Sequence, residues 1–279
     1  MVIIADSGST KTDLVVLSDG KLTKSVQTIG MNPYFISSEE ISATLERELT
    51  PLINPDDIRH IYFYGAGCSF DDKRNIVKKG FESIFNAATI KVDHDLMGAA
   101  RALYKNEKGI VGILGTGSNS CVYDGRDIVA KIFSTGYIFG DEGSGAYIGK
   151  NFITQHLKKR SPKEISKSFH QFYGYSDEDI LTNVYKKPFP NKYLATFSIF
   201  IKQYISNPYM ASLVEESFVD YFREQVASLP DYKNLPFSFI GSVGCNFIEQ
   251  VRKAAAKYDI EISKYMVSPI EGLIEYHAN

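Results

Sequence analysis

The chain has 279 residues, of which 44% are apolar and 23% are charged, and its formal net charge is -2 at pH 7. This length suits two domains of ordinary size. The charge lacks the clustered basic residues that binding to nucleic acid or to a membrane surface requires. The sequence also shows no long apolar run and no signal-peptide pattern, so we expect a globular cytoplasmic protein whose partners are small molecules.

The cysteines and histidines do not suggest a metal site. Cys68, Cys121 and Cys245 lie far apart in the sequence, with no C-x-x-C spacing and no neighbouring histidine. Neither a zinc site nor a disulfide framework is therefore expected, and buried reduced thiols are the better interpretation. The five histidines are also scattered, and only His94 stands beside a predicted site.

A polar turn separates the first two predicted strands, which cover residues 2–5 and 13–18. The turn, Asp6–Asp13, reads D-S-G-S-T-K-T-D. It can present backbone N–H groups, hydroxyls and one cation to an anion, and Gly8 allows close approach of the backbone. An ordinary polar hairpin turn is the alternative interpretation. The hydroxyls belong to Ser7, Ser9, Thr10 and Thr12, and the cation is Lys11.

Further strands and helices follow this hairpin in a recognisable order. A third strand is expected at 22–28, and a capping box at Ser37–Glu40 begins a helix that Pro51 ends. The order β-β-β-α-β-α-β-α is the ribonuclease H-like arrangement, a mixed sheet whose first three strands are antiparallel. The remaining elements are a strand at 58–64, a helix at 71–85, a strand at 88–92 and a helix at 96–104.

The pattern that opens the chain, a strand, a polar glycine-containing turn and two further strands joined by an Asp-Gly turn, then occurs a second time. A strand at 110–114 ends in a glycine-rich and hydroxyl-rich turn, and two further strands at 119–123 and 128–133 flank the turn Asp124-Gly125. Two copies of one unusual device indicate an internal duplication. We therefore expect an N-terminal domain at 1–108, which the closing helix 269–279 joins, and a C-terminal domain at 109–268 with a helical insertion.

A third glycine turn, Gly241–Gly244, follows a buried strand at 237–240 and begins a helix. Ligands of α/β sheets gather at the carboxyl ends of strands. Two turns from duplicated halves that face each other would grip a polyphosphate from both sides. The third turn could admit a flat purine against bare backbone, or could serve only close packing of helix and strand. The sequence contains no G-x-x-x-x-G-K-[ST] loop, which excludes a P-loop kinase.

The order of these motifs resembles that of one ATPase superfamily. D-x-G-x-T-K-T-D, then G-T-G-S, then G-D-E-G-S and a late glycine pair look like the actin, heat-shock chaperone and sugar-kinase superfamily. Within it the chain is most similar to N-acetylglucosamine kinases and to the BadF-BadG-BcrA-BcrD-type ATPases, which include activators of hydroxyacyl-CoA dehydratases. The resemblance spans nearly the whole chain and implies two actin-like ATPase domains with a cleft between them.

The resemblance implies a site for ATP and Mg²⁺. Asp6 would hold the Mg²⁺ of Mg-ATP through water, and the first turn would face the terminal phosphates. The second turn matches the family's other phosphate motif, and the third matches its adenosine motif. The implied ATP-binding residues are Gly8, Ser9, Thr10 and Lys11 in the first turn, Gly115, Thr116, Gly117, Ser118 and Asn119 in the second, and Gly241, Ser242 and Gly244 in the third.

A carboxylate at the start of the helix after residue 92 is similar to the family's catalytic aspartate. The spacing to the following glycine selects Asp95, which could accept the proton of the sugar hydroxyl as it attacks the γ-phosphate. The same side chain could instead, or in addition, be the N-cap of the following helix. Asp93 competes as the base, and strand alternation places both aspartates on the same side, so alternation cannot separate them.

The substrate residues implied by the resemblance are Asn32 in G-M-N-P, Gly140, Asp141 and Glu142 in G-D-E-G-S, and Asp95. Amide donors and carboxylate acceptors together suit a neutral polyol.

The predicted function is an ATP-dependent kinase for an amino sugar, N-acetylglucosamine in the first place, in a chain compatible with a homodimer. One alternative is an activating ATPase, which needs cysteines for an iron–sulfur cluster near the second turn, where Leu114 stands. The other is a non-catalytic sugar sensor.

Overall fold

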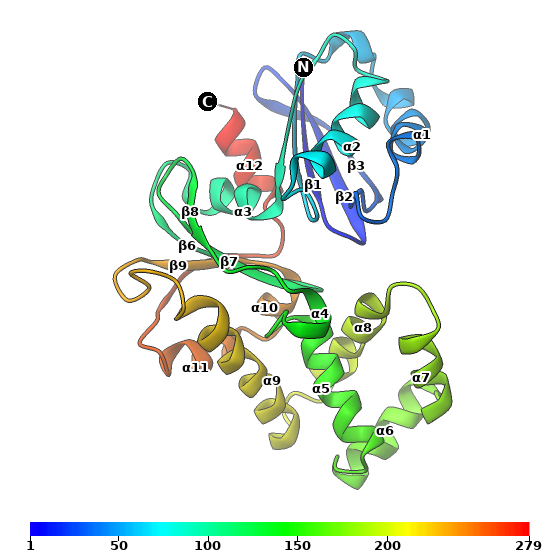
Figure 1. Cartoon of the computed structure of the whole chain (residues 1–279), viewed down its shortest axis with the longest axis vertical. Coiled ribbons are helices and arrows are strands. Elements are labelled where there is room, and N and C mark those ends of the chain that lie inside the picture. The colour runs from blue at the N-terminus through cyan, green and yellow to red at the C-terminus, as the bar shows by residue number, and fades with distance from the viewer. Residues whose placement is uncertain (279) are drawn as a thin grey trace. The chain divides into compact units, whose positions relative to one another are not determined.

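A computed structural model describes residues 1–278. The chain forms two compact units, one made of Met1–Glu107 with the segment from Ser268 to the C-terminus, and the other of Lys108–Val267 (Figure 1). Each unit contains one sheet of five strands and has its own hydrophobic core. No helix within residues 1–278 is long and apolar enough to cross a membrane.

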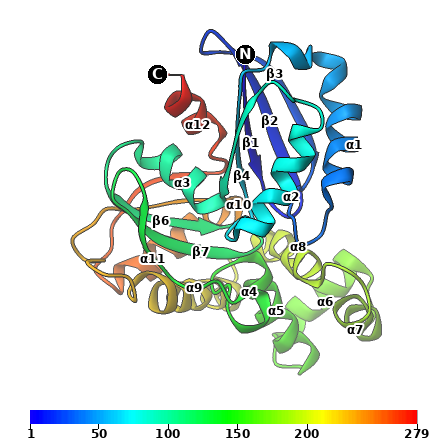
Figure 2. The same ribbon diagram turned by 45° about the horizontal axis from the view of Figure 1, so that its top comes forward.

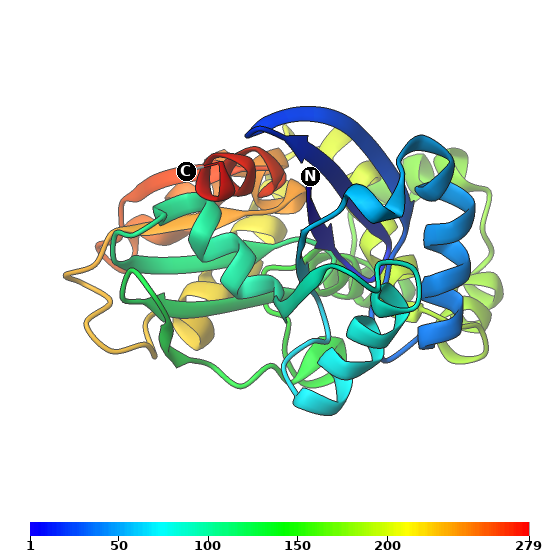
Figure 3. The ribbon, with the colours of Figure 1, turned by 90° about the horizontal axis from the view of Figure 1, so that it is seen from above.

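The first unit is a mixed sheet in the order β3-β2-β1-β4-β5. Its first three strands are antiparallel, and β4 and β5 run parallel to β1, as the sequence predicts. Figures 2 and 3 show α1 and α2 on one face of this sheet, and α3 with α12 on the other. The strands are β1 (Val2–Ser7), β2 (Lys11–Ser18), β3 (Lys21–Ile29), β4 (His60–Gly65) and β5 (Thr89–His94). The helices are α1 (Ser38–Glu48), α2 (Asp71–Glu82), α3 (Asp95–Tyr104) and α12 (Ile270–His277), with short 3₁₀ turns at Thr50–Leu52 and Pro55–Asp57.

Local sequence explains several of these boundaries. Helix α1 begins at the predicted capping box, in which the Ser37 side chain accepts from the Glu40 amide and the Glu40 side chain accepts from the Ser37 amide. Helix α12 packs against α3 through Gly272, where a Cβ atom would lie 2.5 Å from the Ala102 carbonyl oxygen. A larger residue at this position would separate the two helices.

The second unit repeats this topology in the order β10-β9-β6-β7-β8. Read from the other edge, the order is β8-β7-β6-β9-β10, so β6 corresponds to β1 at the centre of the first sheet and each other strand also has a counterpart at the same position. The repeated order confirms two ribonuclease H-like units. The strands are β6 (Gly109–Leu114), β7 (Ser118–Tyr123), β8 (Ile128–Lys131), β9 (Phe237–Ile240) and β10 (Ile262–Met266). Helices α10 (Ser242–Asn246) and α11 (Ile248–Ala256) connect β9 to β10.

A helical insertion enlarges the second unit between β8 and β9, where the first unit has α1 as its only α-helix. Four phenylalanines of these helices form an aromatic core, because Phe152, Phe169, Phe197 and Phe200 are fully buried and pack together. These side chains form the core-facing stripe of the insertion. The helices are α4 (Gly136–Phe139), α5 (Gly145–Leu157), α6 (Lys163–Tyr173), α7 (Asp177–Tyr185), α8 (Pro190–Gln203) and α9 (Pro208–Tyr221), which a π-helical turn at Phe222–Val226 extends.

Candidate active site

The first predicted phosphate turn is a rigid loop between β1 and β2. The Gly8 amide donates to the Lys11 carbonyl at 2.9 Å, and the Gly30 amide donates to the Thr10 carbonyl at 3.1 Å. Gly30 packs directly behind the loop, since a Cβ atom there would lie 2.5 Å from the Gly8 carbonyl oxygen. The Ser9 and Thr10 amides have no acceptor within residues 1–278, so these two N–H groups are the ones that an anion can take.

Two of the four hydroxyls of this loop point inward. Ser7 and Thr12 are fully buried, their hydroxyl oxygens lie 2.8 Å apart, and both accept from the Met31 amide. They therefore fix the chain around Met31 and do not present oxygens to a ligand. The sequence interpretation was wrong on these two residues, and Ser9 and Thr10 remain as the accessible hydroxyls.

Lys11 lies on the surface beside the loop. Its ammonium group forms an ion pair with Asp13 at 2.9 Å, and its side chain is 54% exposed. Asp13 also accepts from Gln27 at 2.6 Å. The contact of Lys11 with phosphate stays a prediction, and such a contact requires the ammonium group to share or leave Asp13.

Asp6 interacts electrostatically with two other carboxylates of the first unit. It pairs with Asp13 across the hairpin and lies at the carboxyl end of β1. Burial raises the pKa of Asp6 to about 7, repulsion from Asp95 and Asp13 adds to the shift, and only Lys11 opposes it. Carboxylates that repel one another are the donor set that a hard divalent cation prefers, so these residues fit the predicted Mg²⁺. The sequence analysis missed Asp13, although hairpin register alone places it opposite Asp6.

The structure separates Asp95 from Asp93 in a way that strand alternation could not. Strand β5 ends at His94, and Asp95 is the first residue of α3, so the alternation of the strand does not extend to it. The N-cap of α3 is His94, whose Nδ1 accepts from the Met97 amide at 3.3 Å. The N-cap role predicted for Asp95 is therefore wrong, because the cap falls one residue earlier.

The two aspartates also differ in their influence on Asp6. Repulsion from Asp95 contributes to the raised pKa of Asp6, and Asp93 is not among the causes of that shift. Burial raises the pKa of Tyr64 to about 12, with Arg101 opposing the shift and Asp93 adding to it. Asp95 is thus the aspartate of this pair that shares an electrostatic environment with Asp6.

Asn32 connects the predicted substrate segment to the first turn. Its side chain is buried, its Nδ2 donates to the Ser9 hydroxyl at 2.8 Å, and its Oδ1 accepts from the Tyr34 amide at 3.0 Å. Gly67, at φ +83°, packs so closely on Asn32 Oδ1 that a Cβ atom there would overlap it. Asn32 therefore holds Ser9 in position, and its contact with a sugar remains a prediction.

The second predicted phosphate turn lies between β6 and β7 and is fastened to a helix. The Gly115 amide donates to the Gly117 carbonyl at 3.0 Å. The first amides of α5 donate to this turn, Gly145 to the Gly115 carbonyl at 2.9 Å and Ala146 to the Thr116 carbonyl at 3.1 Å. These bonds satisfy helix N–H groups that would otherwise lack partners. Asn119, at the start of β7, uses its Oδ1 to accept from the Ser120 amide at 2.9 Å.

The G-D-E-G-S segment packs against this second turn. Asp141, in a left-handed conformation at φ +57°, accepts weakly from the Ser118 amide at 3.4 Å, and a Cβ atom on Gly117 would lie 3.1 Å from its carboxylate. Glu142 instead accepts from Gln225 at 3.0 Å. Asp141 is therefore the carboxylate at the turn, and Glu142 faces the π-helical segment. Gly140 lies against Thr135, where a Cβ atom would overlap the hydroxyl.

The third glycine turn packs against the backbone of Leu114 and Gly115, where the second turn begins. Gly241 adopts φ +125°, and a Cβ atom on it would collide with the Leu114 carbonyl oxygen. A Cβ atom on Gly244 would lie 2.5 Å from the Phe239 ring. Close packing alone accounts for both glycines, while Ser242, the first residue of α10, is exposed. The contact of this turn with adenosine stays a prediction.

Comparison with known proteins identifies the family. The profile of the BadF/BadG/BcrA/BcrD ATPase family matches residues 5–265. The chain belongs to this family. As a member of it, the protein uses ATP, and the resemblance inferred from the motifs is confirmed. A search of curated proteins finds no match.

Several solved structures are similar to this ATPase. A candidate N-acetylglucosamine kinase from Porphyromonas gingivalis is 43% identical to it over 100% of this chain and 99% of that chain, with a TM-score of 0.95. A candidate N-acetylglucosamine kinase from Chromobacterium violaceum is 18% identical over 99% and 98% of the two chains, with a TM-score of 0.71. A ROK family glucokinase from Streptomyces griseus, in complex with glucose and AMPPNP, is 14% identical over 98% and 97%, with a TM-score of 0.56. The last two show the shared fold alone.

Proposed function

We propose that this ATPase is a carbohydrate kinase that transfers the γ-phosphoryl group of ATP to a hydroxyl of an amino sugar, N-acetylglucosamine in the first place. The observation that carries the proposal is the position of Asp95. It stands at the head of α3, at the carboxyl end of β5, and its charge acts on Asp6 beside the first turn. The 43% identity with a candidate N-acetylglucosamine kinase supports the choice of substrate.

Each residue then has a chemical task. Asp95 orients the acceptor hydroxyl and takes its proton, which is the part that phosphoryl transfer leaves to a side chain. The free amides of Ser9 and Thr10 bind phosphate oxygens. Asp6 would hold Mg²⁺, which neutralises phosphate charge when bound. Asn32 keeps Ser9 in place through its hydrogen bond and provides amide groups to the sugar. Asp141 would accept hydrogen bonds from sugar hydroxyls.

Two other functions are compatible with the family and make different predictions. A dehydratase activator needs thiolate ligands for an iron–sulfur cluster, yet Cys121 is buried in β7 and Leu114 ends the strand beside the second turn. A brown, oxygen-sensitive protein would favour the activator. A non-catalytic sensor would bind sugar without turnover, which calorimetry can show. The retention of both Asp6 and Asp95 favours the kinase.

The deciding experiment is a coupled assay of ADP release. It screens N-acetylated hexoses, free hexoses and muramic acid derivatives with Mg-ATP. We expect turnover with N-acetylglucosamine to exceed that with glucose, and mass spectrometry to detect a sugar phosphate. ATP hydrolysis that no sugar accelerates would contradict the proposal.

A further inference from the structure

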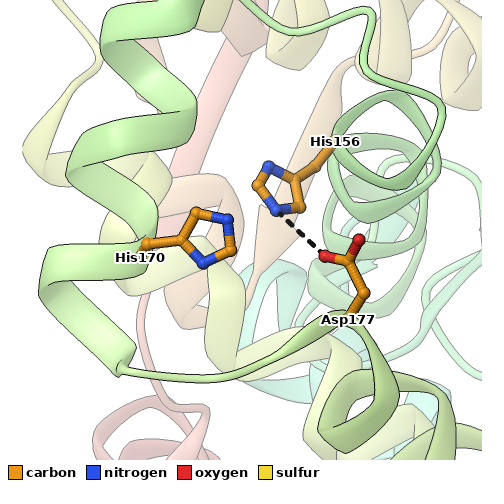
Figure 4. Close-up of side chains that lie close together, drawn as sticks. All are labelled: His156, His170 and Asp177. Carbon is orange, nitrogen blue, oxygen red and sulfur yellow. Dashed lines mark ion pairs between the residues drawn. The ribbon is translucent and has the colours of Figure 1, made fainter.

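Three side chains of the helical insertion, none of which belongs to the candidate active site, converge on one another. His156 lies in the last turn of α5, His170 in the last turn of α6, and Asp177 is the first residue of α7. Their potential ligand atoms all lie within 4.8 Å of one another. Figure 4 shows the two imidazole rings and the carboxylate turned toward a common point.

The buried member of this group lacks hydrogen-bond partners. His156 is only 1% exposed, and neither of its ring nitrogens has a partner, nor has Asp177 Oδ1. Buried polar atoms are nearly always paired, because leaving them unpaired costs free energy. His156 Nε2 lies 3.8 Å from Asp177 Oδ1, which is too long for a hydrogen bond. Ligand atoms of a tetrahedral zinc ion, with bonds of about 2.0–2.2 Å, lie about 3.4 Å apart, so the gap is close to that of two ligands sharing an ion.

The other two side chains are already held in a form that can bind a metal. His170 Nδ1 lies 3.2 Å from the Tyr175 carbonyl oxygen, and because a carbonyl only accepts, this nitrogen must donate. In the neutral ring the Nε2 atom of His170 then carries the lone pair, as in histidines that ligate zinc. Asp177 Oδ2 accepts from Lys159 at 2.8 Å, which fixes the carboxylate and leaves Oδ1 toward His156.

We propose that His156, His170 and Asp177 form a binding site for one divalent transition-metal ion, Zn²⁺ in the first place. Two imidazole nitrogens and one carboxylate oxygen are a ligand set that suits zinc, whereas calcium and magnesium prefer oxygen alone. Water would complete the tetrahedron, since His170 and Asp177 both reach solvent. The scattered spacing of the histidines hid this site from sequence analysis, because three separate helices bring the residues together.

The bound ion would tie the ends of α5 and α6 to the start of α7. These helices lie in the insertion of the second unit, and none of the three ligands belongs to the phosphate turns or to the Asp6 and Asp95 group. Metal bound here adds to the stability of the insertion through linkage of binding to folding. This role does not depend on the proposed kinase activity.

The test uses the full chain after treatment with EDTA and removal of the chelator. Calorimetry with ZnCl₂ measures affinity and stoichiometry, thermal unfolding measures the gain in Tm, and Co²⁺ in place of zinc reports tetrahedral geometry through its visible absorption. The variants are Asp177→Asn and His170→Gln. The matched controls are Glu178→Gln, an exposed neighbour on the same helical turn, and His60→Gln, an exposed histidine of the first unit.

We expect one equivalent of zinc per wild-type chain, a rise in Tm of roughly 5 to 10 °C when free zinc is 100-fold above its Kd, and the absorption of tetrahedral Co²⁺. Both controls should behave as wild type, and both variants should bind zinc at least 10-fold more weakly. Zinc that fails to bind the wild type, or that shifts Tm equally in wild type and variants, would overturn the proposal. Circular dichroism establishes that each variant is folded, and should one unfold, the other variant and the wild-type titration still decide.

Discussion

The two phosphate turns occupy equivalent places in two sheets of the same topology, yet they are stabilised differently. The first is closed by its own backbone and is surrounded by the charged residues Asp6, Lys11 and Asp13. The second gives the carbonyls of Gly115 and Thr116 to the N-terminus of α5. The first turn thus carries the charged chemistry, while the second is hydrogen-bonded to the start of a helix.

One feature is common to both turns. A glycine from another segment packs against the backbone of each, Gly30 behind the first and Gly241 behind the second. In both places a Cβ atom would meet main-chain atoms, which cannot rotate away as a side chain can. The close approach of bare backbone is therefore the feature that the two turns share, and charge is the feature that differs. The following variants test this division.

Asp95→Asn should have the largest effect, because we assign proton transfer to Asp95, which belongs to the same unit as the charged first turn. We expect kcat to fall by about 10²- to 10⁴-fold, the usual contribution of a positioned base, with little change in Tm. The matched control is Asp93→Asn, which keeps the residue type two positions away and should lose less than 10-fold. Equal losses in the two variants, measured by ADP release with sugar, would refute the assignment.

Gly241→Ala should damage the second turn more than Gly30→Ala damages the first. Gly241 combines a collision with the Leu114 carbonyl and a φ of +125°, whereas Gly30 has the collision alone. We expect the free energy of unfolding to fall by about 2–5 kcal/mol for Gly241→Ala and by about 1–3 kcal/mol for Gly30→Ala. Gly136→Ala is the control, since Gly136 has φ +71° and open space, and should lose only about 1–2 kcal/mol. Chemical denaturation measures the free energy of unfolding of the three variants. Equal losses in Gly241→Ala and Gly136→Ala would show that packing against Leu114 contributes nothing.

Asp6→Asn should stabilise the protein in the absence of ligand. The raised pKa of Asp6, about 7 against an ordinary 3.8, means that the folded chain keeps a proton that the unfolded chain releases. Wild-type stability from this group is therefore lost as the pH rises from about 4 to about 7. We expect the free energy of unfolding of Asp6→Asn to exceed that of the wild type by roughly 1 to 3 kcal/mol at pH 8 and by little at pH 4. Thermal unfolding at both pH values measures this difference in stability, and Asp19→Asn, a change at an exposed aspartate, is the control. A difference that does not grow with pH would contradict the raised pKa of Asp6.

Lys11→Met should have the smallest effect on stability. Its ion pair with Asp13 is exposed, so we expect a loss below about 1 kcal/mol. If Lys11 moves to phosphate when nucleotide binds, the KM for ATP should rise while kcat with saturating ATP stays within a few fold. An unchanged KM would confine Lys11 to its pair with Asp13.

The sequence was sufficient for the fold and for the positions of the turns. Strand periodicity, the paired D-G hairpins and the capping box at Ser37–Glu40 depend on neighbours in the chain, and the structure confirms each of them. The five-strand order of both sheets follows, because short hairpins make antiparallel pairs and helical crossovers make parallel ones. Motif order was also enough to identify the ATPase family.

Tertiary structure alone decided how individual side chains are used. Because β5 ends at His94, His94 is the cap and Asp95 is the first residue of α3, where its charge raises the pKa of Asp6. Packing around Met31 turned Ser7 and Thr12 inward. The packing of three helices brought His156 to Asp177. Local sequence fixes which backbone conformation a segment prefers, but the direction of a side chain depends on where each element stops and on what packs against it.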